Sequence, residues 1–145
     1  MVAWRLRGVP AGSGPPGHRR GAALVEFAVV LPVLLLLLLG LMELGWAFFK
    51  ASQLTTAARA GVREAIRPDT TEVDVQVKLD EMMQTMGMGG VSYDFELEPG
   101  VSVEAGEPIE VSVVVAYDQL TLTGLRMIPM LETLRGHAAM AKEGP

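Results

Sequence analysis

The chain has 145 residues, half of which are apolar, so it has room for one small domain and an additional segment. It has no cysteine, which excludes a disulfide, a thiolate metal site and a thiol nucleophile. Its net charge of −5 comes with no basic patch and no P-loop, zinc or Gly-x-Ser-x-Gly motif, so we expect no nucleic-acid partner, no metal or other cofactor and no enzyme.

Residues 1–21 form a basic N-terminal flank. Four arginines and no acid precede Glu26, whereas from Trp46 to the end eight Lys and Arg stand against fifteen Asp and Glu. By the positive-inside rule the flank stays in the cytoplasm and the acidic remainder is exported. Three prolines and five glycines in the flank favour a disordered tail over a helix.

An apolar run follows the flank. Residues 27–42 carry no charge, and the whole tract 22–46 is long enough to cross a hydrocarbon core of about 30 Å, which takes roughly 20 helical residues. No later segment repeats this pattern, so we expect a single transmembrane helix, which Pro32 could kink. The run is too long for an ordinary secretory signal and no small-x-small cleavage site follows it, so an uncleaved signal anchor is the plain interpretation.

Glu26 calls for a second interpretation. An ionised carboxylate inside a bilayer costs several kcal/mol, so an acid there predicts a partner. If the chain is cut after Gly21, Ala22 becomes a free α-ammonium four residues from Glu26, on the same face of the helix. In neighbouring subunits, the carboxylate of one could then meet the amine of the next.

Glu43 lies seventeen residues further along, or about 25 Å at 1.5 Å per helical residue. It should therefore lie near the opposite side of the membrane, at the outer interface, where Trp46 is placed to act as an aromatic anchor. Glu43 either marks the edge of the membrane or contacts a partner protein.

The helix is expected to continue beyond the membrane as an amphipathic segment over residues 47–67. Small or apolar residues recur there in steps of three and four, and Pro68 ends the pattern. Ala57, Gly61 and Ala65 form a small-x3-small ladder that would allow another backbone to come close. The ladder could pack on the chain's own C-terminal domain or, in part, on a neighbouring subunit.

Residues 68–145 are expected to form a small exported domain. Residues 71–86 fit a helix better than a strand, with Thr70 or Thr71 as the N-cap, glycines after the end and methionines as core filler. Alternation in 91–97 and 109–117 predicts two strands joined by the loop 98–108, and Val101 and Val103 could extend the first. A third strand is expected in 134–142. The apolar segment 120–131 could cover the core, and an exposed apolar patch there would mark a partner surface.

Together these elements predict an α+β fold: a long N-terminal helix, a second helix, and an antiparallel sheet of about three strands. Four acids in the second half (Glu98, Glu104, Glu107 and Glu110) do not have EF-hand spacing and are expected to form a solvated face.

Residues 19–67 resemble the TadE-like pseudopilins of tight-adherence (Flp-type, type IVb) pilus systems. The positions that carry the resemblance are Arg20-Gly21-Ala22, Val25-Glu26-Phe27, Pro32, Glu43-Leu44-Gly45, and Ala57-Ala58-Arg59-Ala60-Gly61-Val62-Arg63. Gly21 to Phe27 is also similar to the type IV prepilin cleavage motif, which has a basic leader, a glycine before the cut and a glutamate five residues after it.

The resemblance implies a pilin-like fold and cleavage between Gly21 and Ala22 by a prepilin peptidase, with Glu26 and Phe27 serving recognition or assembly. It further implies a minor pseudopilin in the inner membrane, single-pass, with its N-terminus in the cytoplasm. The implied partners are the peptidase, other Tad assembly proteins, pilin subunits and membrane lipid. TadE and TadF types share this layout, and both stay open. The alternative is an uncleaved, signal-anchored protein with an extracytoplasmic binding or sensor domain.

Overall fold

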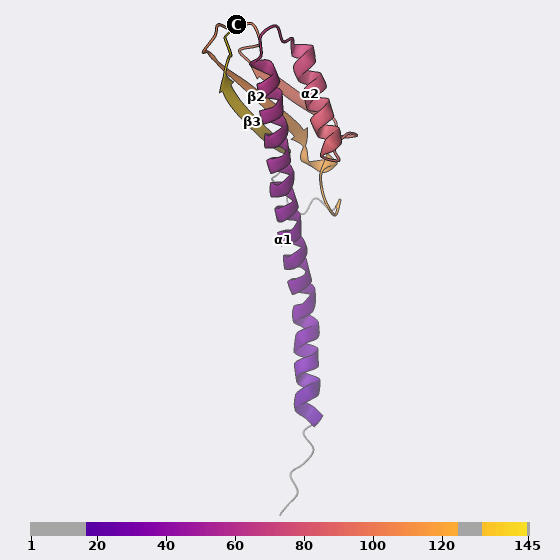
Figure 1. The fold of residues 1–145 in the computed structure, drawn as a ribbon. Helices are drawn as coiled ribbons and strands as arrows, with labels where there is room; N and C mark the ends of the chain where they lie inside the picture. Colours follow the sequence, from indigo (N-terminus) through magenta and orange to yellow (C-terminus); the bar gives the residue numbers. More distant parts are fainter. Residues whose placement is uncertain (1–16, 125–131, 145) are drawn as a thin grey trace, which may run out of the picture. The chain divides into compact units, whose positions relative to one another are not determined.

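The structure is a computed structural model that describes residues 17–124 and 132–144, with side chains described from residue 21 onward. Its elements in chain order are α1 (Gly17–Ala65), α2 (Glu72–Thr85), β1 (Tyr93–Glu98), β2 (Pro108–Ala116), a 3-10 turn η1 (Tyr117–Gln119) and β3 (Thr133–Ala141) (Figure 1). The chain divides into two compact units, residues 1–38 and 39–145, and α1 contributes to both. The predicted α+β class is confirmed, with two helices and a three-stranded antiparallel sheet.

The first unit contains the most apolar part of α1. Large apolar side chains are exposed all along it, from Leu24 to Leu38, and mean hydropathy reaches 2.8 over a window of this helix. Among the described residues, α1 is the one helix long and apolar enough to span a membrane. It begins at Gly17, ahead of the Ala22 at which a processed chain would start. No proline lies between Pro16 and Pro32, so nothing in that stretch interrupts the backbone hydrogen bonds.

In the second unit, α1 and α2 lie against the same face of the sheet (Figure 1). Leu54, Ala58 and Val62 of α1 are completely buried, as are Val75 and Leu79 of α2. The exposed Val73 and Val77 lie on the other side of α2. This spacing is helical, which confirms a helix rather than a strand in this segment.

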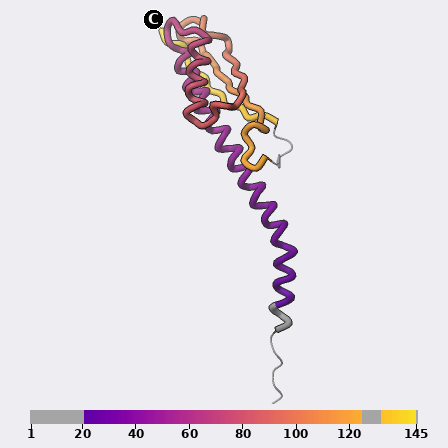
Figure 2. Tube along the Cα trace, turned by 90° about the vertical axis from the view of Figure 1, so that its right-hand side faces the viewer, coloured from indigo at the N-terminus to yellow at the C-terminus, as the bar shows by residue number. Residues whose placement is uncertain are grey.

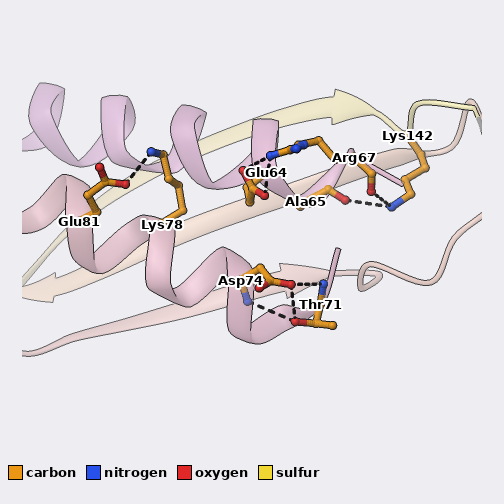
Figure 3. Close-up of polar contacts among 8 residues, drawn as sticks. All are labelled: Glu64, Ala65, Arg67, Thr71, Asp74, Lys78, Glu81 and Lys142. Atoms are coloured by element: carbon orange, nitrogen blue, oxygen red, sulfur yellow. Dashed lines mark hydrogen bonds and ion pairs between the residues drawn. The ribbon is translucent and has the colours of Figure 1, made fainter. Parts of the chain in front are cut away.

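α2 begins with a reciprocal capping box. The backbone N–H of Asp74 donates to Thr71 Oγ1 at 3.3 Å, and the backbone N–H of Thr71 donates to Asp74 Oδ2 at 2.9 Å (Figure 3). Thr71 is thus the N-cap, one of the two residues predicted for this role. After the helix, Gly87 adopts a positive φ of 71°, which a glycine allows at no steric cost.

The sheet has the order β1-β2-β3, and both pairings are antiparallel. Alternate residues of β2 (Ile109, Val111, Val113 and Val115) are buried under the helices. Glu96, Glu110 and Arg135, from the three strands, are exposed on the opposite face. The observed β3 agrees with the third strand expected in 134–142.

Two details of the strands differ from the prediction. Val101 and Val103 do not extend β1, because Pro99 offers no N–H to a neighbouring strand and Gly100 turns the chain with a φ of 117°. Both valines nevertheless pack against the core. Tyr117 does not continue β2 but enters the 3-10 turn, where its side chain remains buried.

The end of β3 is fastened to the end of α1. Lys142 Nζ donates to the backbone oxygens of Ala65 at 3.1 Å and Arg67 at 2.8 Å (Figure 3). The backbone N–H of Glu143 donates to Ile66 O at 3.0 Å. These bonds satisfy carbonyl groups that a helix end leaves without partners. The C-terminal end of the chain therefore lies beside the turn after α1 (Figure 2). α1 ends two residues earlier than predicted because Pro68 disfavours helical geometry in the residue before it.

The closest approach between helix and sheet occurs at Gly136 in β3. A Cβ atom placed on this residue would overlap the backbone carbon of Leu54 and the backbone nitrogen of Thr55, and would lie 2.5 Å from Leu54 O. The strand and the helix are therefore in direct backbone contact. At Gly61 the space is less tight, because an added Cβ would meet only side chains, the nearest being Leu79 Cδ2 at 2.9 Å.

Candidate functional site

The residues of the predicted processing motif lie in the first unit. Gly21, Ala22, Glu26 and Phe27 are all exposed on α1. Among the described residues, Glu26 takes part in no hydrogen bond or ion pair. A side chain added at Gly21 would meet no atom within 4 Å. The described part of the chain therefore gives neither a partner for Glu26 nor a structural reason for the glycine.

Glu43 is in the opposite situation, because its side chain is 0% exposed and its carboxylate accepts four hydrogen bonds. The hydroxyl of Tyr117 donates to Oε1 at 2.7 Å, and the backbone N–H of Leu122 donates to the same oxygen at 3.2 Å. Thr123 donates to Oε2 twice, from its N–H at 3.2 Å and from its hydroxyl at 3.1 Å. We call Glu43, Tyr117, Leu122 and Thr123 the Glu43 cluster.

The 3-10 turn brings these donors to the helix. β2 ends at Ala116, and the turn redirects the chain so that the side chains of Tyr117 and Leu120 are buried and the backbone N–H groups of Leu122 and Thr123 reach Glu43. Trp46, one helical turn after Glu43, donates from Nε1 to the backbone oxygen of Leu120 at 2.6 Å. One face of α1 thus binds the segment 117–123 through an acceptor at Glu43 and a donor at Trp46.

An aromatic and cationic group lies next along α1. The rings of Trp46 and Phe49 are 5.6 Å apart, and Lys50 Nζ lies 5.0 Å from the centre of the Trp46 ring. These distances allow a cation–π contact. Trp46, predicted as an interface anchor, therefore combines an aromatic surface with a satisfied polar atom, as interfacial tryptophans do.

The Glu43 cluster favours the neutral form of the Tyr117 phenol. Burial first, and then the adjacent Glu43 carboxylate, raise the pKa of Tyr117 from 10.0 to about 12. Because the folded chain holds this proton more tightly than the unfolded chain, the resulting stabilisation is complete below pH 10 and is lost as the pH rises through about 12.

We expect the phenolate absorbance of a Tyr93→Phe variant, which retains Tyr117 as its one tyrosine, to appear near pH 12 rather than near pH 10. Adding Glu43→Gln should lower this pKa only partly, because burial is the larger cause. A midpoint at the ordinary value in the folded Tyr93→Phe protein would show that the cluster does not form. The Tyr93→Phe/Tyr117→Phe variant provides the blank.

Ala57, Gly61 and Ala65 are buried in the second unit. A Cβ on Gly61 would meet Leu79 of α2 and Val111 of β2, so this part of the ladder packs on the chain's own domain. This was one of the two alternatives that the sequence left open. The backbone that comes closest to α1 is that of Gly136, which the sequence analysis did not single out. A glycine inside a predicted strand is the signal that could have found it.

Among the described residues, the side chains predicted as functional come together only at Glu43 and Trp46. No group of three or more His, Asp or Glu in this part of the chain could hold a metal ion. Glu98 and Glu110 are neighbours across β1 and β2 on the solvent face. The sequence analysis did not predict the donors of the Glu43 cluster, because they lie 74 to 80 residues along the chain from the acid they bind and no local pattern links them to it.

The comparison with known proteins gives one finding. No curated protein and no solved structure matches this chain. Residues 21–63, less than a third of the chain, match a protein-family model. The match begins at the glycine of the processing motif and includes both Glu26 and Glu43. The matched family is that of the TadE-like proteins, which confirms the resemblance found in the sequence.

Proposed function

We propose that this protein is a minor pseudopilin-like subunit that serves the assembly of a tight-adherence (Flp-type) pilus. A prepilin peptidase would cut it between Gly21 and Ala22. The TadE-like match supports a role in pilus assembly. The observation that carries the finer proposal is the contrast between two acids of one helix. Glu43 accepts four hydrogen bonds within the chain, whereas Glu26 is exposed and receives none from the described residues.

This contrast points to a partner outside the chain for Glu26. A carboxylate exposed on a membrane-spanning helix is costly unless another group compensates its charge. After cleavage, the new α-ammonium of Ala22 carries the complementary charge, and a neighbouring copy can present it to Glu26. The proposed subunit is anchored in the inner membrane by α1, with its N-terminus in the cytoplasm and its folded domain outside.

Gly21 supports the same proposal by a separate argument. A glycine inside a helix destabilises it by about 1 kcal/mol relative to alanine. Here a side chain would meet nothing in the described part of the chain, so the domain's own packing does not require the glycine. A constraint from outside, such as a narrow peptidase site around the scissile bond, accounts for it.

We expect Gly21→Leu to block maturation while leaving the folded domain unchanged. The measurement is the intact mass of the full chain purified from cells that contain the prepilin peptidase. The wild type should begin at Ala22 and the variant should retain Arg19 and Arg20. Gly40→Leu, also at an open helical glycine, is the matched control and should be processed normally. A wild-type chain that keeps Arg19 and Arg20 would instead indicate an uncleaved signal anchor.

We expect Glu26→Ala and Glu26→Gln to be cleaved normally but to reduce piliation severely, because both remove the charge that pairs with Ala22. Glu26→Gln keeps the size of the side chain and so isolates the charge. Val25→Ala, a neighbouring exposed position, is the control and should assemble normally. Counting pili by electron microscopy is the readout. Normal piliation in both Glu26 variants would rule out the assembly role of this acid.

A further inference from the structure

We propose that the lipid-facing surface of this protein does not stop at Glu43 but continues to Phe49 and includes Leu122. The partner is the boundary between lipid headgroups and acyl chains, into which the base of the exported domain is immersed. We call Leu44, Phe48, Phe49 and Leu122 the apolar collar. The proposal rests on the membrane span of α1 and not on pilus assembly, so it can fail independently of the proposed function.

The first argument is one of length. If Glu43 met solvent, the uncharged part of α1 would be residues 27–42, or about 24 Å at 1.5 Å per residue. This length is less than the thickness of a hydrocarbon core, about 30 Å, which requires roughly 20 helical residues. Because Glu43 is 0% exposed, the outer surface of α1 carries no charge from residue 27 to residue 49. That run measures about 35 Å and fits the core.

The second argument is the composition of the exposed surface. Phe48 is 68% exposed, Phe49 51% and Leu122 44%. Leu122 lies at the level of Glu43, because its backbone N–H reaches that carboxylate. Leu44 and Phe48 also line an apolar groove of about 130 Å³ with Ala47, Ala51 and Leu134. The first exposed polar side chain on α1 after Glu26 is Ser52, beyond the collar.

The third argument is the direction in which polar groups point. At the level of the collar, the Glu43 carboxylate, the Tyr117 hydroxyl and Trp46 Nε1 all bond to groups of the same unit. Polar groups satisfied inside and apolar side chains outside are what a hydrocarbon environment demands. Lys50 is only 7% exposed and its Nζ lies 5.0 Å from the centre of the Trp46 ring, so an aromatic side chain covers its charge at this level too.

Spin labelling can test the collar directly, because the chain has no native cysteine. Single cysteines replace Phe48 or Leu122 in the full chain, which is reconstituted in vesicles of phosphatidylcholine and phosphatidylglycerol. The ratio of collision with oxygen to collision with a polar nickel chelate reports depth. Leu36→Cys serves as the reference inside the span, and Thr56→Cys as the reference in water, since both positions are exposed.

We expect the ratio at Phe48 and Leu122 to be several times that at Thr56 but lower than that at Leu36, because the collar lies at the boundary and Leu36 lies near the middle of the span. Ratios equal to the Thr56 value, with Leu36 still in lipid, would place the boundary at Glu43 and overturn the proposal. Low collision with both reagents would place the collar in a protein contact instead and would also overturn it. None of these readouts requires the peptidase or a pilus, so processing at Gly21 can succeed or fail without affecting them.

Discussion

Replacing Gly136 by alanine is expected to lower the free energy of unfolding of the α+β domain by more than about 3 kcal/mol, at or beyond the usual upper limit for overpacking a core. The added Cβ would overlap the backbone of Leu54 and Thr55, not the end of a flexible side chain. Relief would require β3 to move away from α1, which would break its pairing with β2 or its packing on the helix. Denaturant unfolding of the full chain in detergent micelles measures the effect.

Two glycines provide a graded control for Gly136. At Gly61 the nearest atom to an added Cβ is Leu79 Cδ2, which can rotate away, so Gly61→Ala should cost less. At Gly144 the nearest atom is Ala105 Cβ at 3.8 Å, an ordinary contact, so Gly144→Ala should leave the unfolding midpoint unchanged. Equal midpoints for Gly136→Ala and Gly144→Ala would show that β3 does not cross α1 at Gly136.

Replacing Glu43 by alanine is expected to lower the free energy of unfolding by about 3 kcal/mol or more, since each buried donor left without an acceptor destabilises the fold by about 1–3 kcal/mol. The Tyr117 hydroxyl and the N–H groups of Leu122 and Thr123 would all lose their acceptor. The fluorescence of Trp46 in a Trp4→Phe background can follow unfolding, because Trp46 bonds to the same segment.

Tyr117→Phe separates the hydroxyl from the rest of the Glu43 cluster. It removes one donor and leaves Glu43 with three hydrogen bonds, so it should lower the free energy of unfolding by about 1–2 kcal/mol. The stability of Glu43→Gln should lie between those of Tyr117→Phe and Glu43→Ala, because the glutamine keeps one carbonyl oxygen as an acceptor but presents an NH₂ group to the other donors. If Glu43→Ala unfolds like the wild type, the acid is not a structural anchor and its role must lie with a partner protein.

Local patterns in the sequence were sufficient to predict the helices and strands of this fold. Helical spacing identified α2 despite its alternating valines, and period-two alternation located β1 and β2. Cap chemistry limited the N-cap of α2 to Thr70 or Thr71, and the structure has Thr71 in this role. The errors lay at the edges, where Pro99 and Gly100 ended β1 before Val101, and where Tyr117 left β2 for a 3-10 turn.

What the sequence could not supply were contacts between distant residues. Glu43 was recognised as an unusual acid, but its donors follow β2 and become visible only when the 3-10 turn is in place. The Gly136 contact likewise depends on the angle at which β3 crosses α1. A glycine inside a strand can indicate a close backbone approach, but it does not say which element approaches. The segment 125–131, predicted to cover the core, lies outside the described residues.

The distance in sequence between Glu43 and its donors also determines when the acid can be satisfied. In the proposed topology Thr123, which follows Glu43 by 80 residues, crosses the membrane long after α1 has entered it. During export Glu43 therefore has none of these donors, and we expect the newly inserted helix to expose it to water with the shorter apolar run in the bilayer. Only when the domain closes on α1 is the charge withdrawn from the surface. Residues 43–49 could then enter the bilayer, so α1 would move toward the cytoplasm by about seven residues. The depth of the anchor would thus depend on the docking of the segment 117–123 on α1.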